Sequence, residues 1–229
     1  MKNKLRAQNK ADARWLGDAI GPTSADPLHT ALDALFAADP EMDSATAAAR
    51  LVRTSLASDQ AAVWYDQAEI EPIGNVMLAV TVRGLAALDF GVTKDIFISE
   101  VRRGLKSIPQ HNPNKLSAIV KQVREYLLGK RTEFDLALDM RLMTDFQRTV
   151  LQATQTVPHG SVATYGEIAK RIGKPKAARA VGQALGRNPI PLVIPCHRVL
   201  ASDGSLGGYS GGGGLATKLQ LLQLEGALK

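Results

Sequence analysis

The chain has 229 residues, with 28 Lys and Arg against 22 Asp and Glu, a formal net charge of +6, and a single cysteine. One cysteine excludes a disulfide framework and suits a reducing compartment, so we expect a cytoplasmic protein. No apolar run approaches membrane-spanning length, and the basic residues 1–10 have no apolar segment behind them, which argues against a signal peptide.

Residues 1–60 predict a helical extension of unknown role. Apolar residues recur there at helical spacing in two groups, which are Leu28, Leu32, Leu35 and Phe36, then Ala47, Leu51 and Val52. This spacing indicates two amphipathic helices. We expect them to pack on the body of the protein rather than to carry a separate activity.

Residues 61–140 predict a small domain of strands and helices, with a boundary near the linker Gly129–Arg131. Alternating apolar residues favour a hairpin that turns at Arg83-Gly84. The predicted elements are strands at Asn75–Val82, Leu85–Phe90 and Phe134–Leu138, and helices near Lys94–Leu105 and Lys115–Leu128.

Residues 141–229 begin with a pattern typical of a helix-turn-helix. A first helix runs from Phe146 to Val157 and ends at a Pro-His-Gly turn. Thr164 and Glu167 then form a capping-box pattern for a short helix that Gly173 ends. Pro175 suits the first position of a second helix, which Asn188-Pro189 terminates. This shape binds nucleic acid in many proteins and serves only for packing in others.

Charge distinguishes those two interpretations. Between Arg141 and Val199 the acidic residues are only Asp145 and Glu167, whereas the basic residues are Arg141, Arg148, Lys170, Arg171, Lys174, Lys176, Arg179, Arg187 and Arg198. Such a concentration favours a phosphate-binding surface over a solvated basic face. The outward face of the second helix is mostly small, with Ala178, Arg179, Gly182 and Gln183, and so suits close approach in the minor groove.

The only cysteine, Cys196, has features of a nucleophile. It follows an apolar run, Pro191–Ile194, that predicts a buried, extended segment. His197 and Arg198 place a base and a cation beside it in the sequence, and positive charge favours the thiolate. The alternatives are a small buried hydrophobe for Cys196 and a flexible linker for the glycine-rich segment Gly204–Gly214.

Taken together, these motifs resemble the O6-alkylguanine-DNA alkyltransferases, also called methylated-DNA–protein-cysteine methyltransferases. The order and spacing of the motifs agree with that family from about Asp145 to Glu225, and the segment around Ile73–Leu85 is similar to its amino-terminal sheet. The matching stretches are Thr164–Glu167, Lys174–Gly182, Asn188-Pro189, Ile194–Val199, Gly207–Ser210 and Leu221–Gly226.

The resemblance implies a fold and a set of catalytic roles. The fold is α/β (α+β), with a ribonuclease H-like amino-terminal domain and a winged helix-turn-helix-like domain that carries the active site. Cys196 would accept the alkyl group once and irreversibly, with His197 as base through a water and Glu225 orienting the imidazole. Asn188 would support the thiol, and Tyr209 would hydrogen-bond or protonate the departing guanine.

The resemblance also implies how the substrate is held. Tyr165 would crowd the target phosphate and Arg179 would fill the gap left by an extruded base, because the alkylated atom lies inside the duplex. The other DNA-binding positions are Ala178, Gly182 and Arg187. The substrate pocket comprises Pro191, Val199, Gly207, Tyr209 and Ser210.

We therefore expect a single-turnover repair protein that binds double-stranded DNA carrying O6-alkylguanine, and also acts on O4-alkylthymine. It is expected to be a monomer without cofactor or membrane association, and without a metal site, because the zinc sites of some family members need cysteines that this chain lacks. The alternatives are a non-catalytic lesion-binding or winged-helix regulatory protein, against which the intact Cys196, His197 and Glu225 argue, and a cysteine hydrolase. A hydrolase would need an oxyanion hole and would turn over repeatedly.

Overall fold

The computed structural model describes residues 33–34, 37–39, 42–47, 49–50 and 62–228. The chain divides into two compact units, Met1–Ser58 and Asp59–Lys229. In the first unit, residues 44–47 and 49–50 are helical and Ala47 is buried. The two predicted helices stay a prediction, because the other residues that predicted them lie outside the described residues; those residues are Leu28, Leu32, Leu35, Phe36, Leu51 and Val52. Within the described ranges, no helix is long and apolar enough to cross a membrane.

The second unit begins with a sheet whose strand order, over residues 62–228, is β3-β2-β1-β4. Its strands are β1 (Val63–Ile70), β2 (Gly74–Thr81), β3 (Gly84–Phe90) and the short β4 (Gln110–His111). The predicted hairpin is confirmed as β2 and β3, each within one residue at its ends. The sequence did not predict β1, whose exposed Gln67 and Glu69 interrupt its apolar pattern.

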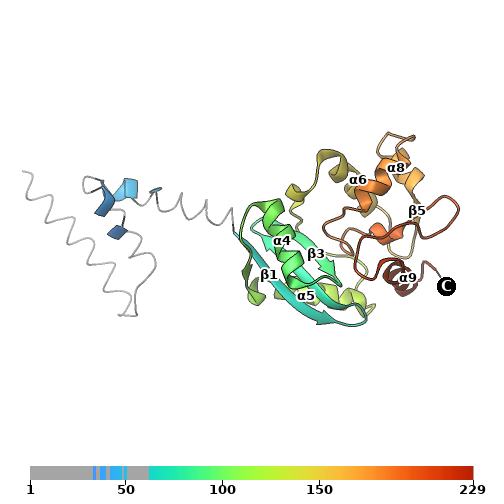
Figure 1. The fold of residues 1–229 in the computed structure, drawn as a ribbon, viewed down its shortest axis with the longest axis horizontal. Coiled ribbons are helices and arrows are strands. Elements are labelled where there is room, and N and C mark those ends of the chain that lie inside the picture. Colours follow the sequence, from blue (N-terminus) through green and yellow to red (C-terminus); the bar gives the residue numbers. More distant parts are fainter. Residues whose placement is uncertain (1–32, 35–36, 40–41, 48, 51–61, 229) are drawn as a thin grey trace, which may run out of the picture. The chain divides into compact units, whose positions relative to one another are not determined.

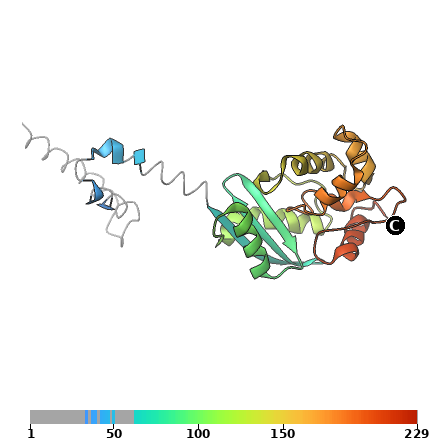
Figure 2. The same cartoon turned by 45° about the horizontal axis from the view of Figure 1, so that its top comes forward.

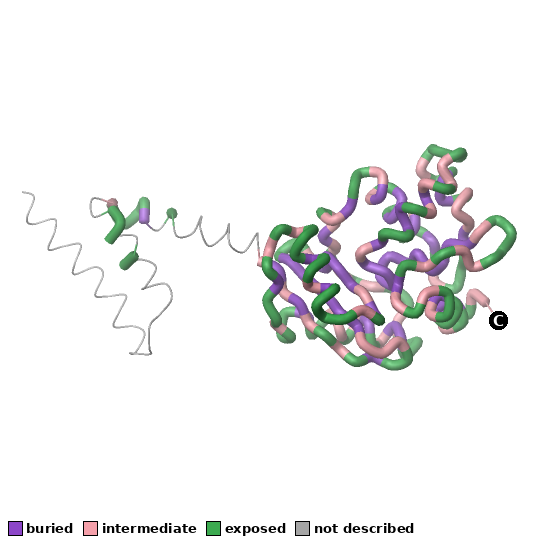
Figure 3. Tube along the Cα trace, in the orientation of Figure 1, coloured by how far each residue is buried: buried purple, intermediate pink, exposed green. Residues whose placement is uncertain are grey.

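Two helices cover opposite faces of this sheet (Figures 1 and 2). They are α4 (Lys94–Leu105), as predicted, and α5 (Pro113–Leu127), which begins two residues before the predicted start. Successive side chains of a strand point to opposite faces. Leu78 of β2 accordingly belongs to the core that includes Tyr126 of α5, whereas Met77 packs with Phe97 of α4. In Figure 3, the mostly buried residues of β2 and β3 are purple and the mostly exposed residues of α4 in front of them are green.

The predicted strand Phe134–Leu138 is wrong, since these residues, all of them described, form only an isolated bridge between Leu138 and Leu85. The backbone around residues 137–139 nevertheless bonds to the outer edge of β3. Leu85 N–H donates to Ala137 O at 2.9 Å, and Asp139 N–H donates to Leu85 O at 2.8 Å. These bonds stop after one residue because the chain turns into the 3-10 helix η1 (Met140–Leu142).

The remaining residues form helices around a small parallel strand pair. The helices are α6 (Asp145–Gln155), α7 (Tyr165–Arg171), α8 (Ala178–Leu185) and α9 (Gly214–Leu224), with the 3-10 helix η2 (Cys196–Arg198), and the strands are β5 (Ala163–Thr164) and β6 (Val199–Leu200). Leu78, Tyr126, Val150 and Ile194 share one apolar core, so both halves of this unit are packed together.

The predicted start of α7 is confirmed in atomic detail. Thr164 Oγ1 accepts a hydrogen bond from Glu167 N–H at 3.1 Å, and Glu167 Oε2 accepts one from Thr164 N–H at 2.6 Å. The predicted start of α8 is wrong, because the helix begins at Ala178 and Pro175 lies in the preceding turn.

The segment Pro191–Ile194 is buried as predicted, but it is not extended. Ile194 N–H donates to Ile190 O at 2.9 Å, and Leu192 adopts φ of 74°. The segment is therefore a tight turn, whose apolar residues gave the same sequence pattern as a buried strand. Cys196, the first residue of η2, follows this turn in the chain after Pro195.

Gly84 generates the first prediction, because a Cβ there would lie 2.1 Å from Ala137 O and its φ is +127°. Gly84→Ala should lower the free energy of unfolding in urea by about 1–3 kcal/mol more than a substitution that only strains the backbone. Gly129→Ala is the control, since its φ is +69° and nothing lies within 4 Å of its Cβ. Equal losses of stability in the two variants would show that the backbone at Ala137 moves away from the new Cβ without cost.

Candidate active site

Cys196 lies at the start of η2 and its side chain is held by Asn188. Asn188 Nδ2 donates to Cys196 Sγ at 3.3 Å and to Ile194 O at 2.9 Å, while its Oδ1 accepts from Ile190 N–H at 3.0 Å. The amide thus fixes the turn before the thiol and also contacts the sulfur. Cys196 is 5 % exposed.

The charge near the sulfur differs from the sequence-based expectation. Burial raises the pKa of the Cys196 thiol, against the hydrogen bond from Asn188 and the charge of Lys218, which lower it. Arg198 was expected to be the cation beside the thiol. Its guanidinium instead bonds to Glu225 and to Val157 O, and the cation whose charge lowers the pKa of the thiol is Lys218.

Lys218 on α9 is fully buried, and the sequence analysis did not identify it. Its Nζ donates to the carbonyl oxygens of Val199 at 2.6 Å, Leu206 at 2.5 Å and Gly208 at 3.3 Å. Burial lowers the pKa of this amine to about 8. A sequence signal did exist, because Lys218 shares one helix face, at spacings of three, four and seven residues, with Leu221, Leu222 and Glu225.

His197 and Glu225 form a fully buried pair, with Nε2 of His197 2.5 Å from Oε1 of Glu225. Burial alone would raise the pKa of Glu225, but His197, Arg198 and Tyr126 hold it well below its usual range. Burial lowers the pKa of His197. Because an ionised carboxylate only accepts hydrogen bonds, Nε2 carries the hydrogen and Nδ1 is the basic nitrogen. Among the described residues, Nδ1 has no hydrogen-bond partner.

Further donors converge on Glu225 from distant parts of the chain. Arg198 Nε donates to Oε2 at 2.8 Å, Gly160 N–H donates to Oε2 at 3.2 Å, and the Tyr126 hydroxyl contacts Oε1. Tyr126 was not identified from the sequence. Its position, 99 residues before Glu225, left no local pattern that could reveal the contact.

Cys196 borders a cavity of about 490 Å³ between α7, α8 and the loop before α9. The lining includes seven residues proposed from the sequence, which are Tyr165, Ala178, Arg179, Gly182, Cys196, Tyr209 and Ser210. The other lining residues are Gln183, Leu185, Gly186 and Gly208. Burial raises the pKa of Tyr209, and its hydroxyl has no hydrogen-bond partner within residues 62–228.

Not every predicted pocket or DNA-binding residue lies at this cavity. Pro191 and Val199 are buried outside its lining. Gly207 is close to the ring of Tyr165, because a Cβ at Gly207 would lie 2.9 Å from the Tyr165 hydroxyl oxygen. Arg187 is exposed and also lies outside the lining.

The helix-turn-helix presents an exposed basic surface beside this cavity. Its exposed cations are Lys170, Arg171, Lys174, Lys176, Arg179 and Arg187. Arg171 also donates to Thr156 Oγ1 at 2.9 Å, and Lys174 lies over the Phe146 ring. Arg179 is the cation that lines the cavity itself.

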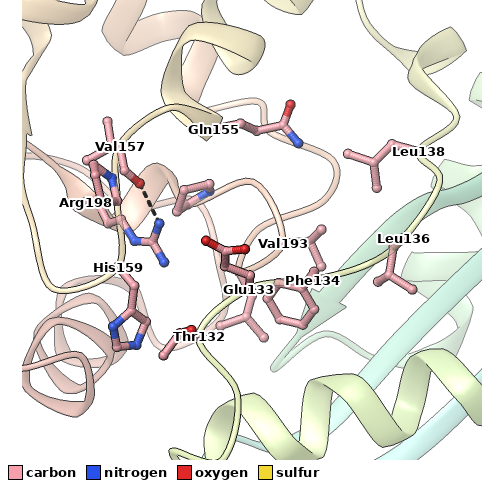
Figure 4. A pocket seen from close by; sticks show the side chains of 13 residues that line it. Thr132, Glu133, Phe134, Leu136, Leu138, Gln155, Val157, His159, Val193 and Arg198 are labelled. Atoms are coloured by element: carbon pink, nitrogen blue, oxygen red, sulfur yellow. Dashed lines mark hydrogen bonds between the residues drawn. The ribbon is translucent and has the colours of Figure 1, made fainter.

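A second cavity, of about 340 Å³, does not include Cys196 in its lining. Figure 4 shows its polar side chains, among them Glu133, His159 and Arg198, facing the apolar Phe134 and Leu136. Arg198 donates to Val157 O at 2.6 Å at the cavity wall. In the described part of the chain, no group of three or more His, Cys, Asp and Glu side chains could hold a metal ion.

Two family models match this chain. Residues 71–140 match the ribonuclease-like domain of 6-O-methylguanine DNA methyltransferase, and residues 145–227 match the DNA-binding domain of the same family. A methylated-DNA–protein-cysteine methyltransferase of Mycolicibacterium paratuberculosis is 53% identical over 114 residues, which cover 50% of this chain and 67% of that protein. The Methanosarcina barkeri protein of the same name is 43% identical over 163 residues, covering 71% of this chain and 97% of that protein.

Solved structures agree with these matches. The structure of Mycobacterium tuberculosis OGT in complex with DNA has a TM-score of 0.62 and 40% identity, covering 72% of this chain and 93% of that chain. The O6-methylguanine-DNA methyltransferase of Pyrococcus kodakaraensis has a TM-score of 0.51 and 27% identity, covering 72% and 99%. The fold and the cysteine site thus define a protein of the alkyltransferase class. The chain belongs to the 6-O-methylguanine DNA methyltransferase family.

The buried charges around Glu225 generate the second prediction. Glu225→Gln leaves Arg198 buried without its counter-charge, and should lower the free energy of unfolding by about 3–5 kcal/mol at neutral pH. Because the folded chain lowers the pKa of Glu225, wild-type stability falls as the pH drops below about 4.3, and this part of the fall should be absent from the variant.

Urea unfolding between pH 3 and 8 measures both effects. The control is Glu125→Gln, which removes a partly exposed pair with Arg131 and should cost about 1 kcal/mol or less. Similar losses in the two variants would contradict a central role for Glu225.

Proposed function

We propose that this chain repairs DNA by transferring an alkyl group from O6 of guanine to Cys196, as a methylated-DNA–protein-cysteine methyltransferase. The observation that carries the proposal is the cavity that Cys196 shares with Tyr209 and Arg179, directly beside the exposed basic helices. The names of its relatives support the same activity. O4-alkylthymine is a second substrate of the same chemical kind.

The reaction is a single displacement at the alkyl carbon. The sulfur of Cys196 forms the new S–C bond, the C–O bond to guanine breaks, and guanine leaves with the bonding electrons and takes up a proton. A thioether remains on Cys196. The hydroxyls of Tyr165, Tyr209 and Ser210 at the cavity are too weakly nucleophilic to break the S–C bond of a thioether, so each molecule acts once.

The proton of Cys196 needs an acceptor, because burial raises the pKa of the thiol and the resting group is protonated. Nδ1 of His197 is the basic nitrogen of a neutral imidazole and is unpaired among the described residues. We assign His197 as the base, acting through a bridging water, and Glu225 as the residue that fixes its tautomer. Asn188 stabilises the developing thiolate through its 3.3 Å contact with the sulfur.

The leaving guanine is held by the loop before α9. Tyr209 remains protonated because burial raises the pKa of its hydroxyl, so it can donate a hydrogen bond to the departing base. Ser210 lines the same cavity and is assigned to the guanine oxygen. Pro191, Val199 and Gly207 do not line the cavity, and their proposed role is to support the residues that do.

DNA binding is assigned to the basic surface of α7 and α8. Ala178 and Gly182 leave little bulk on the face of α8 that borders the cavity, which suits approach along the minor groove. Arg179 enters the base stack, Tyr165 crowds the phosphate of the target nucleotide, and Arg187 contacts the backbone. Extrusion of the target base is required because the alkylated atom is inaccessible in a paired duplex.

The organisation of the chain completes the proposal. Residues 61–140 form the amino-terminal domain, residues 141–229 carry catalysis and DNA binding, and residues 1–60 are an extension outside the chemistry. The protein acts as a cytoplasmic monomer and needs neither metal nor organic cofactor, since the displacement uses only the thiol and a base.

The third prediction tests the reaction itself. Incubation with a methylated oligonucleotide should raise the intact mass by one methyl group in place of one hydrogen, and peptide mapping should place it on Cys196. Cys196→Ala should bind the DNA without any mass change. Binding without transfer in the wild type would indicate a lesion-binding protein, and multiple turnover would indicate a hydrolase.

The fourth prediction separates base extrusion from alkyl transfer. Arg179→Ala should slow repair of methylated duplex severalfold, because the variant cannot compensate for a few kcal/mol of unstacking. Its reaction with the free base O6-benzylguanine, which needs no extrusion, should be nearly unchanged. The matched control is Lys176→Ala, an exposed cation outside the cavity lining, which should weaken DNA binding without this selective loss. Equal loss on both substrates would show that Arg179 supports the pocket.

A further inference from the structure

The outer edge of β3 bonds to the segment around Ala137 and also to the half of the unit that carries Cys196. Leu88 N–H donates to Pro189 O at 2.9 Å, directly after Asn188 in the chain. β3 is the outermost strand of its sheet, and an outermost strand carries backbone groups that need partners. Figure 1 shows β3 on the side of the sheet that faces α6 to α9.

Phe90, the last residue of β3, is 1 % exposed and contacts the glycine-rich loop. A Cβ on Gly212 would lie 1.7 Å from Phe90 O, and one on Gly211 would lie 2.6 Å from Phe90 Cζ. The loop backbone therefore rests directly against Phe90. Any side chain at either glycine position would force the two segments apart.

The same contact reaches the catalytic cavity through Tyr209. The rings of Phe90 and Tyr209 have centroids 6.3 Å apart and an angle of 33° between their planes. A Cβ on Gly211 would also lie 2.7 Å from Tyr209 Cε1, so Gly211 fills the space between the two rings. Tyr209 lines the cavity beside Cys196.

Among the described residues, few other contacts hold the middle of this loop, where Gly214 N–H donates to Gly211 O at 3.1 Å within the loop itself. Lys218 holds the carbonyl of Gly208, and α9 begins at Gly214. Between them, Ser210 Oγ donates to Leu185 O at a long 3.5 Å. Glycine-rich backbone loses more conformational entropy on ordering than other sequences, so the middle of the loop needs a firm contact to stay in one place.

We propose that Phe90 is a positioning residue for alkyl transfer, which holds Tyr209 over the cavity through Gly211 and Gly212. The amino-terminal domain thereby contributes to the active site without touching the substrate. This inference rests on the proposed function, because it concerns the placement of the group that receives the leaving guanine.

The test measures single-turnover rates of the full chain with O6-benzylguanine and, separately, with iodoacetamide. Phe90→Ala should slow the benzylguanine reaction on the order of tenfold or more, because displacement of a positioned group by about 1 Å has effects of this size. Alkylation of Cys196 by iodoacetamide, which uses no guanine-binding group, should be unchanged or faster.

Gly212→Ala provides a second variant that leaves the amino-terminal core intact. Its Cβ would push the loop from Phe90, so it should show the same selective loss. The controls are Leu78→Ala, which truncates a side chain of β2 in the same core, and Gly214→Asn, where nothing lies within 4 Å of a Cβ and asparagine tolerates the φ of +57°. Both should react with O6-benzylguanine within about twofold of wild type, since neither change forces an atom between Phe90 and the loop.

A double-mutant cycle with Tyr209→Ala decides whether Phe90 acts through Tyr209. The effect of Phe90→Ala should largely disappear in the Tyr209→Ala background, because residues in contact are not additive. Full additivity, or parallel loss of both reactions in Phe90→Ala and Gly212→Ala, would overturn the inference. A wild-type protein that fails to react with O6-benzylguanine and methylated DNA would instead contradict the proposed function.

Discussion

The buried carboxylate of Glu225 is the interaction on which the arrangement of this site depends. It receives Tyr126 from α5, Gly160 from the loop after α6, and both His197 and Arg198 from η2. These segments come from both halves of the second unit, so one charge fixes their relative positions. A buried carboxylate is tolerated only when its oxygens are satisfied, and here Arg198 supplies the counter-charge.

That arrangement gives His197 a defined tautomer, with a basic nitrogen, Nδ1, that has no hydrogen-bond partner within the described ranges. The thiol beside it in the sequence is held by Asn188 and lies near the Lys218 ammonium. Burial keeps the thiol protonated at rest, which protects it from adventitious oxidation, since the thiolate is the reactive form. In the reaction that we propose, Cys196 loses its proton only when His197 accepts it, which suits a protein that uses its cysteine once.

The active site is a product of both halves of the unit rather than of the cysteine-bearing half alone. Tyr126 reaches Glu225 from the amino-terminal side, and the edge of β3 bonds to Pro189 and supports the glycine loop. The family models match the two halves separately, at residues 71–140 and 145–227. Phe90 belongs to the apolar core that the two halves share, and Tyr209 packs against that core.

Local patterns in the sequence predicted those elements whose causes are local. The hairpin of β2 and β3, the span of α4 and the capping box of α7 depend on neighbouring residues, and all were predicted to within a residue or two. The segment Pro191–Ile194 was misassigned because a buried tight turn and a buried strand are equally apolar. Phe134–Leu138 was misassigned because strand pairing depends on a partner that the local sequence does not contain.

The sequence by itself determined the family and the helix-turn-helix, and it pointed to Cys196 as the nucleophile that we propose, because these lie in contiguous motifs with fixed spacing. Only the tertiary structure decided which charge lies near the thiol, since Lys218 rather than the adjacent Arg198 occupies that position. The contacts of Tyr126 with Glu225 and of Phe90 with the glycine loop span about half of the chain, and no local periodicity encodes them. Burial also sets the pKa of Cys196 and of His197, and burial is a property of the packed fold.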